Sequence, residues 1–333
     1  MSRPKQRLLP FFLPMLGCPD RCVYCDQRTI SGKVSAPTAE EVRRALDEFA
    51  PDKEAELAYY GGSFTCLPKA QQEAWLALAA PYIERGVIGG VRVSTRPDAV
   101  DDEVCSFLRE RGVTTVELGV QSFSDEVLEQ SGRSCRREAS VAACGAVQRA
   151  GLRLGVQLMT GLPGDSPKTA RDSMEQALSL GAKLLRVYPT LVLEGTELAR
   201  RYAEGSYRPQ TLEEAVSLCA DLLEMAEEVG AVIQRLGLNP GLELERSLIA
   251  GPYHPAFGGL VREEVCCRRA SALLEAINAV ARPCRLRYAK EDEALIYGQK
   301  RAGYEKLTSR FPGLVMTADP ELAAGEMQAE VIE

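Results

Sequence analysis

The sequence predicts an α/β protein, built as a partial (β/α)6-type TIM barrel with a small C-terminal α/β extension. Three observations support this fold class. Short apolar segments alternate with amphipathic ones, most amphipathic segments end at a glycine, and polar or glycine-rich residues follow the apolar segments. A repeated strand–helix unit favours a parallel sheet, and its right-handed crossovers make the sheet curl in one direction. The active site of such a barrel lies where its strands end.

The expected strands are short runs of apolar, β-branched and aromatic residues, at 8–14, 56–60, 91–95, 115–120, 154–159 and 184–188, with a further strand at 232–237. The expected helices lie between them, at 39–49, 69–85, 102–111, 138–150, 169–180 and 212–229. Thr38 and Glu41 have the spacing of a capping box at the start of the first helix. Glycines such as Gly86 and Gly112 are typical of helix ends.

The pattern changes after residue 240. A glycine-rich stretch at 241–264 is followed by an expected helix at 268–281, and then by a strand–helix–strand unit at 285–288, 293–308 and 314–316. The acidic residues from 319 onward are expected to fray. We therefore expect two domains, a barrel in residues 1–240 and an extension in residues 241–333 that covers the substrate.

Composition limits the class of protein. The 333 residues carry a net charge of −7 at a hydrophobic content of 45%, which argues against a broad nucleic-acid-binding surface, because phosphate contacts need clustered Lys and Arg. Eleven cysteines without a secretory signal indicate a reducing compartment. No apolar run approaches the length of a membrane span. We expect a cytoplasmic protein with no membrane contact.

Three cysteines, Cys18, Cys22 and Cys25, stand in a C-x3-C-x2-C spacing in the loop after the first expected strand. Three thiolates are one short of the four that usually hold an iron–sulfur cluster, so a [4Fe–4S] cluster here would keep one iron open for another ligand. The alternatives are a structural zinc site or three unrelated thiols. Zinc needs a fourth Cys or His nearby, but the next cysteine is Cys66 and the single histidine is His254.

Further motifs follow the strands in order: YYGGSF, VSTRPD, ELGVQS, SGR, LMTGLPGD and RVYPTLVLEGTEL. Together with LGCPDRCVYC they resemble the radical S-adenosylmethionine (SAM) superfamily, in the branch of the radical SAM domain of the Elongator catalytic subunit and its short bacterial relatives. The resemblance covers about residues 7 to 240. It implies reductive cleavage of SAM at a [4Fe–4S] cluster to a 5′-deoxyadenosyl radical, which abstracts hydrogen from a substrate.

Two departures limit this resemblance. The first cysteine spacing is shorter than in the Elongator subunit, and 333 residues leave no room for an acetyltransferase domain. Transfer of an acetyl-derived group to transfer RNA is therefore not expected to carry over. The substrate stays open between a transfer RNA base, which the family branch favours, and a small molecule or peptide, which the acidic charge favours. A non-catalytic iron–sulfur or zinc protein is a further alternative. An electron donor, flavodoxin or ferredoxin, is implied.

The resemblance also implies a set of SAM-binding residues: Tyr24 beside the cluster, the turn Gly61, Gly62 and Ser63 at the amino group, Arg133 at the carboxylate, Gln121, Gln157 and Glu117 as polar contacts, and Gly161 in a turn that supports the adenine. From the residues alone, two glycines at a strand end allow close backbone approach. A guanidinium suits a carboxylate, although a surface ion pair of Arg133 with Glu126 or Glu129 is the plainer alternative.

Three residues are candidates for hydrogen-atom transfer by position. Tyr188 ends the sixth expected strand, and Cys66 and Cys135 lie in loops after strands. Each has a plain structural alternative, since tyrosine packs well at a barrel mouth and free cysteine often behaves as a small buried hydrophobe. His254, in a turn past the barrel, could handle a proton. Lys300 and Arg301 give the extension a basic edge, which is more often a solvated helix face.

Overall fold

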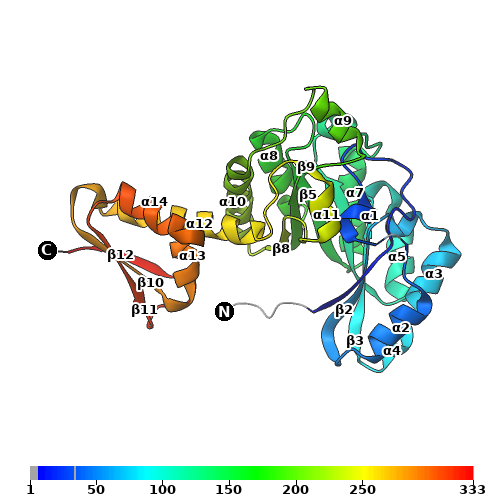
Figure 1. The fold of residues 1–333 in the computed structure, drawn as a ribbon. Coiled ribbons are helices and arrows are strands. Elements are labelled where there is room, and N and C mark those ends of the chain that lie inside the picture. The colour runs from blue at the N-terminus through cyan, green and yellow to red at the C-terminus, as the bar shows by residue number, and fades with distance from the viewer. Residues whose placement is uncertain (1–6, 34, 333) are drawn as a thin grey trace. The chain divides into compact units, whose positions relative to one another are not determined.

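The computed structural model describes residues 7–33 and 35–332, and the chain forms two compact units (Figure 1). The larger unit contains the described residues up to 215 together with 225–255. The smaller unit contains 216–224 and 256–332. The predicted boundary at residue 240 therefore lies within the larger unit, and the predicted role of the extension as a cover for the substrate stays a prediction.

A single parallel sheet of seven strands forms the larger unit, in the order β1-β2-β3-β4-β5-β6-β8. The strands are β1 (Leu8–Phe12), β2 (Asp52–Tyr60), β3 (Ile88–Thr95), β4 (Val113–Gln121), β5 (Arg153–Thr160), β6 (Leu184–Pro189) and β8 (Val232–Leu236). The first and last strands are edges, so the sheet is a curled, open barrel rather than a closed one (Figure 1). The predicted fold class is confirmed.

Helices connect the strands: α1 (Gln27–Ser31), α2 (Ala39–Asp47), α3 (Lys69–Ala77), α4 (Ala80–Glu84), α5 (Asp102–Glu110), α6 (Asp125–Gln130), α7 (Arg137–Arg149), α8 (Pro167–Ser179), α9 (Glu197–Ala203), α10 (Leu212–Glu228) and α11 (Leu242–Ser247). The predicted capping box at Thr38 and Glu41 is present. The single helix predicted at 69–85 is wrong. Two helices stand there, because Pro81 lies in the first turn of α4 and a proline interrupts the hydrogen bonding of a continuous helix.

The two faces of the curled sheet differ in polarity. Leu57, Val93 and Leu118 are fully buried. Their neighbours in sequence are Ala58, Arg92 and Glu117, respectively. Because successive side chains point to opposite faces of a strand, the first set faces the helices and the second set faces the concave side. The concave face holds a buried network of charges, in which Arg92 contacts both Glu56 and Glu117. The barrel interior is therefore polar below the ends of its strands.

The smaller unit has its own core. The strand β10 (Cys284–Ala289) pairs in parallel with β11 (Leu314–Asp319) and antiparallel with β12 (Met327–Val331). The helices of this unit are α12 (Phe257–Ala276), α13 (Glu293–Tyr297) and α14 (Ala302–Arg310). Leu274, Leu286, Ile296 and Phe311 are buried in one cluster among them.

Three predictions for this part of the chain were wrong. The helix predicted at 268–281 begins at Phe257, inside the glycine-rich stretch. The helix predicted at 293–308 is broken, because Lys300 and Arg301 have positive φ. The acidic tail does not only fray, since it forms β12.

Short strands β7 (Val192–Leu193) and β9 (Leu248–Ala250) pair in the larger unit. No helix within the described residues has the length and apolar character needed to cross a membrane.

Candidate functional site

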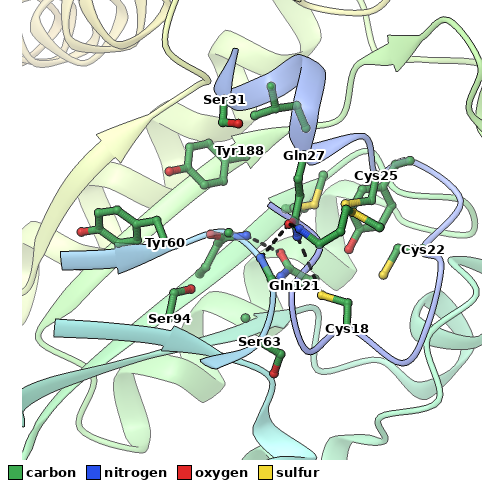
Figure 2. Close-up of a pocket in the computed structure, with 18 of the residues that line it drawn as sticks. Cys18, Cys22, Cys25, Gln27, Ser31, Tyr60, Ser63, Ser94, Gln121 and Tyr188 are labelled. Carbon is green, nitrogen blue, oxygen red and sulfur yellow. Dashed lines mark hydrogen bonds between the residues drawn. The ribbon is translucent and has the colours of Figure 1, made fainter. Parts of the chain in front are cut away.

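A cavity lies at the carboxyl ends of the strands in the larger unit (Figure 2). Its wall includes the loop after β1, with all three motif cysteines, and the ends of β2 through β6. This is the edge at which a parallel barrel collects its functional side chains. Most of the residues predicted from sequence line it: Cys18, Cys22, Cys25, Tyr24, Gly61, Gly62, Ser63, Gln121, Arg133, Gln157 and Tyr188.

The cysteine loop is held in place by contacts on several sides. Leu13 N donates to Tyr60 O at 2.7 Å and so extends the β1–β2 pairing. Val23 N donates to Ser131 O at 3.0 Å, and Asp20 pairs with Arg96 at 2.9 Å. These contacts come from the ends of β2 and β3 and from the end of α6, so the loop that carries the three thiols is fixed against the barrel on three sides.

The three thiols influence one another. Burial, followed by the proximity of Cys22 and Cys18, raises the pKa of Cys25 to about 12. Burial and then Cys22 also raise the pKa of Cys18. Within the described residues no three His, Cys, Asp or Glu side chains converge on a single metal ion. A [4Fe–4S] cluster has a different requirement, because each thiolate binds a separate iron of the cluster. Three thiols whose negatively charged forms repel one another suit a positively charged group, which would stabilise the thiolates.

The glycine turn after β2 packs directly against the cysteine loop. Gly61 and Gly62 both have positive φ, at 74° and 63°. A Cβ on Gly62 would lie 2.1 Å from Leu16 O, closer than any side chain allows. Ser63 N donates to Leu16 O at 2.8 Å, while its hydroxyl lies 2.9 Å from Thr95 Oγ1. The turn therefore needs glycine at position 62, and Ser63 links the turn to the end of β3.

Arg133 reaches the cavity from the loop after α6. Its Nη2 donates to Gly119 O at 2.6 Å and its Nη1 to Cys22 Sγ at 3.4 Å. Its Nε is buried without a hydrogen-bond partner among the described residues. The plainer alternative was a surface ion pair with Glu126 or Glu129, but Glu129 pairs with Arg136 and Glu126 accepts a hydrogen bond from Gln130 Nε2. An unpaired buried N–H beside a thiol cluster fits a carboxylate ligand at this point.

The two predicted glutamines lie side by side. Gln157 Nε2 donates to Gln121 Oε1 at 3.1 Å, and Gln121 itself has a φ of 68°. Positive φ is uncommon outside glycine and concentrates at functional sites. Figure 2 shows Gln121 between the cysteines and the far wall, where Tyr60, Ser94 and Tyr188 stand.

Four predicted residues do not line the cavity: Glu117, Gly161, Cys66 and Cys135. Glu117 lies lower in the barrel, 3.3 Å from Arg92 and 3.0 Å from Arg186. Gly161 O accepts a hydrogen bond from Tyr207 at 2.6 Å. The Cys66 thiol accepts from the Ser63 hydroxyl at 3.2 Å, and Cys135 is buried. Their proposed parts in SAM binding or hydrogen-atom transfer stay predictions.

Other residues at the site were missed from sequence. Gln27 stands in the middle of the cavity wall (Figure 2), but nothing in its local sequence distinguishes it. Arg186 also lines the cavity, and here a signal existed, because it lies two residues before Tyr188 on the same strand and therefore on the same face.

Away from the site, Arg301 stacks over the Tyr304 ring at 4.5 Å in the smaller unit, so part of the predicted basic edge is engaged with aromatic rings. His254 lies in the larger unit but not in the cavity wall.

The sequence matches two known protein families. Residues 12–177 match the radical SAM superfamily, and residues 182–266 match the radical SAM C-terminal domain. An uncharacterized protein of Methanocaldococcus jannaschii is 27% identical over 236 residues, 66% of this chain and 72% of that protein. A tRNA uridine(34) acetyltransferase of the same organism is 31% identical over 129 residues, 38% of this chain but only 24% of that protein. A heme chaperone HemW of Lactococcus lactis is 22% identical, over 72% of this chain and 64% of that protein.

Solved structures show the same fold. The archaeal Elp3 of Methanocaldococcus infernus aligns with a TM-score of 0.60 at 18% identity, over 82% of this chain and 63% of that one. Coproporphyrinogen III oxidase of Escherichia coli, a radical SAM enzyme, aligns with a TM-score of 0.50 at 19% identity, over 68% of this chain and 54% of that one. By its family matches and its curled parallel sheet, the chain belongs to the radical SAM superfamily of enzymes.

Proposed function

We propose that this enzyme binds a [4Fe–4S] cluster through Cys18, Cys22 and Cys25 and cleaves SAM reductively at the iron that these thiolates leave open. The observation that carries the proposal is that three thiols, a glycine turn and an arginine with an unpaired N–H line one cavity. When bound, the reduced cluster and SAM supply a 5′-deoxyadenosyl radical that abstracts hydrogen from the substrate.

The chain's own residues would hold SAM as follows. The backbone of Gly61 and Gly62 faces the cavity without side chains, so it can approach the amino group closely. Arg133 would receive the carboxylate, because its guanidinium is fixed on two sides and keeps a free N–H. Gln121 and Gln157 would contact the remaining polar atoms. A flavodoxin or ferredoxin would supply the electron.

Anaerobic reconstitution followed by reduction with SAM tests the proposal. Wild-type protein should bind iron and sulfide and release 5′-deoxyadenosine, and Cys22→Ala should do neither. Cys105→Ala is the matched control, since Cys105 is a buried thiol on α5 outside the cavity wall. Equal 5′-deoxyadenosine from wild type and Cys22→Ala would refute the assignment of the cluster cysteines.

For the substrate, we propose a transfer RNA base. The support is the similarity to tRNA uridine(34) acetyltransferases, although this chain spans only about a quarter of the archaeal ones and 53% of the one from Dehalococcoides mccartyi. A small molecule or peptide is the second candidate, favoured by the net charge of −7. Membership in an enzyme superfamily argues against a purely metal-binding protein.

Deuterium transfer separates the two substrate classes. Total transfer RNA from cells grown in deuterated medium is added to the reduced enzyme with SAM, and the 5′-deoxyadenosine is examined by mass spectrometry. We expect deuterium in the 5′-deoxyadenosine when labelled transfer RNA is added, because the radical takes its hydrogen from the substrate. Deuterium that appears only with a labelled small-molecule or peptide extract would overturn the transfer RNA proposal.

A further inference from the structure

Gln27 joins the two segments that meet at the site. It is the first residue of α1 and lies two positions after Cys25. Its Oε1 accepts a hydrogen bond from Met15 N at 2.5 Å, in the cysteine loop, and another from Gly62 N at 2.6 Å, in the glycine turn. One amide oxygen thus bridges the predicted cluster loop and the predicted SAM-binding turn (Figure 2).

These two N–H groups need such an acceptor. Met15 and Gly62 both have positive φ, at 60° and 63°, and both lie beyond the last paired residues of β1 and β2, so the strand pairing does not include their N–H groups. A buried backbone donor without a partner is costly. Gln27 satisfies both donors at once, and this holds the loop and the turn at a fixed separation.

The same contacts fix which way the amide points. A backbone N–H can only donate, so the atom that receives both must be the carbonyl oxygen of Gln27, and the NH2 group must occupy the other side. That NH2 group faces Cys18, with Nε2 at 3.9 Å from Sγ, within hydrogen-bond reach of a sulfur acceptor. Two independent backbone contacts therefore direct an N–H donor at one of the three thiols.

We propose that Gln27 is a positioning residue that also tunes the cluster: its amide N–H stabilises negative charge on the Cys18 thiolate and makes reduction of the bound cluster more favourable. The inference rests on the proposed function. Hydrogen bonds to the sulfurs are among the factors that set the potential of an iron–sulfur cluster, and reduction adds negative charge that an N–H donor stabilises. In a partly buried site such a bond is stronger than in water.

Two substitutions separate the roles of the oxygen and the nitrogen. Gln27→Glu keeps an oxygen for Met15 N and Gly62 N but removes the N–H donor and adds a negative charge. Gln27→Leu removes both functions. Gln71→Glu makes the same change of charge at an exposed position on α3 and serves as the control. All proteins are reconstituted anaerobically, assayed for bound iron, and titrated by electron paramagnetic resonance to obtain the midpoint potential.

We expect Gln27→Glu to retain its iron and to show a more negative potential, with about a tenfold fall in the equilibrium constant for one-electron reduction, or about 59 mV. Gln27→Leu should lose most of its iron, and Gln71→Glu should match wild type. A Gln27→Glu potential equal to wild type overturns the tuning role. Equal iron loss in Gln27→Glu and Gln27→Leu overturns the role of the oxygen. Absence of a cluster in wild type would refute the proposed function itself, and the inference with it.

Discussion

Replacing Arg92 by methionine would leave two carboxylates inside the barrel without the cation that they share. The Arg92 side chain is fully buried. Its Nε lies 2.9 Å from Glu56 Oε2 and its Nη1 lies 3.3 Å from Glu117 Oε2. Nη1 also donates to Gln234 Oε1 at 2.7 Å. Methionine fills much of the same space, so the change removes charge and hydrogen bonds more than volume.

The size of the effect follows from what each carboxylate keeps. Removing one partner of a buried ion pair costs about 3–5 kcal/mol, because a charge stays buried and unpaired. Glu56 would keep Arg153 at 2.6 Å and the hydroxyls of Thr114 and Thr115, both at 2.6 Å, and Glu117 would keep Arg186. We therefore expect a loss near the lower end, about 3 kcal/mol in the free energy of unfolding.

Urea unfolding followed by far-UV circular dichroism, at about pH 8, measures this loss. The matched control is Arg149→Met, which also removes an arginine with two contacts to a carboxylate, here Asp102 at 2.9 and 3.0 Å. Both side chains of that pair are more than half exposed, so its removal should cost less than about 1 kcal/mol. If Arg92→Met costs no more than Arg149→Met at unchanged m-values, the buried network does not stabilise the fold.

The pH dependence gives a second check. Burial alone would raise the pKa of Glu56, but Arg92, then the two threonine hydroxyls, and Arg153 outweigh it and leave the pKa lowered. In wild type this carboxylate therefore contributes stability above its unfolded pKa of about 4.3, which is lost as the pH falls through the lower folded value. Without Arg92 the largest contribution that opposes burial is lost, so the pKa of Glu56 should rise. The stability gap between wild type and Arg92→Met should then narrow from about pH 8 to about pH 5.

Two further predictions concern the cavity, and a third concerns Asp165, in the loop between β5 and α8. Gly62→Ala should lose most of its bound iron, because its Cβ would meet Leu16 O at 2.1 Å. Gly32→Ala, whose Cβ would have nothing within 4 Å, should retain its iron, and equal iron content in the two variants contradicts this packing. Arg133→Met should weaken SAM binding about tenfold, as expected for a lost charged hydrogen bond, and an unchanged dissociation constant in calorimetry would remove Arg133 from the SAM site. Burial raises the pKa of Asp165 to about 6, so the folded state favours the protonated carboxyl and loses stability as the pH rises through that value. Asp165→Asn cannot ionise and should therefore raise Tm more at about pH 8 than at about pH 5; the opposite order refutes the assignment.

The strand–helix order of the larger unit was predictable because its signals are local. Alternating apolar segments and terminal glycines predicted all seven strands of the sheet in sequence, together with the edge at which their motifs meet. The start of α12 was missed, although Phe257, Val261 and Val265 have helical spacing and are buried on one face of that helix. Short helices such as α1 and α6 carry too few periodic residues to show a face.

Contacts between distant segments were not predictable in this way. The ion pairs of Arg92 join residues of three strands, and no spacing in the sequence indicates which carboxylate meets which cation. An arginine inside the apolar run of β3 does indicate that an interior partner must exist. Likewise Gln27 bridges Met15 and Gly62 only because the loop folds back onto the turn, so its function depends on tertiary structure alone.

The charge network and the cavity meet at Arg186, whose Nε lies 3.0 Å from Glu117. Its guanidinium lies 4.2 Å from the centre of the Tyr60 ring and donates to the hydroxyls of Tyr60 and Tyr188. The arginine side chain has no hydrogen-bond acceptor atom. Both phenol oxygens therefore accept from Arg186, and their own O–H hydrogens point away from it. Burial raises the pKa of both tyrosines, which keeps them protonated at neutral pH. The wall opposite the cysteines therefore carries two protonated tyrosine hydroxyls, whose oxygens are held by Arg186 and, through it, by the ion pair with Glu117.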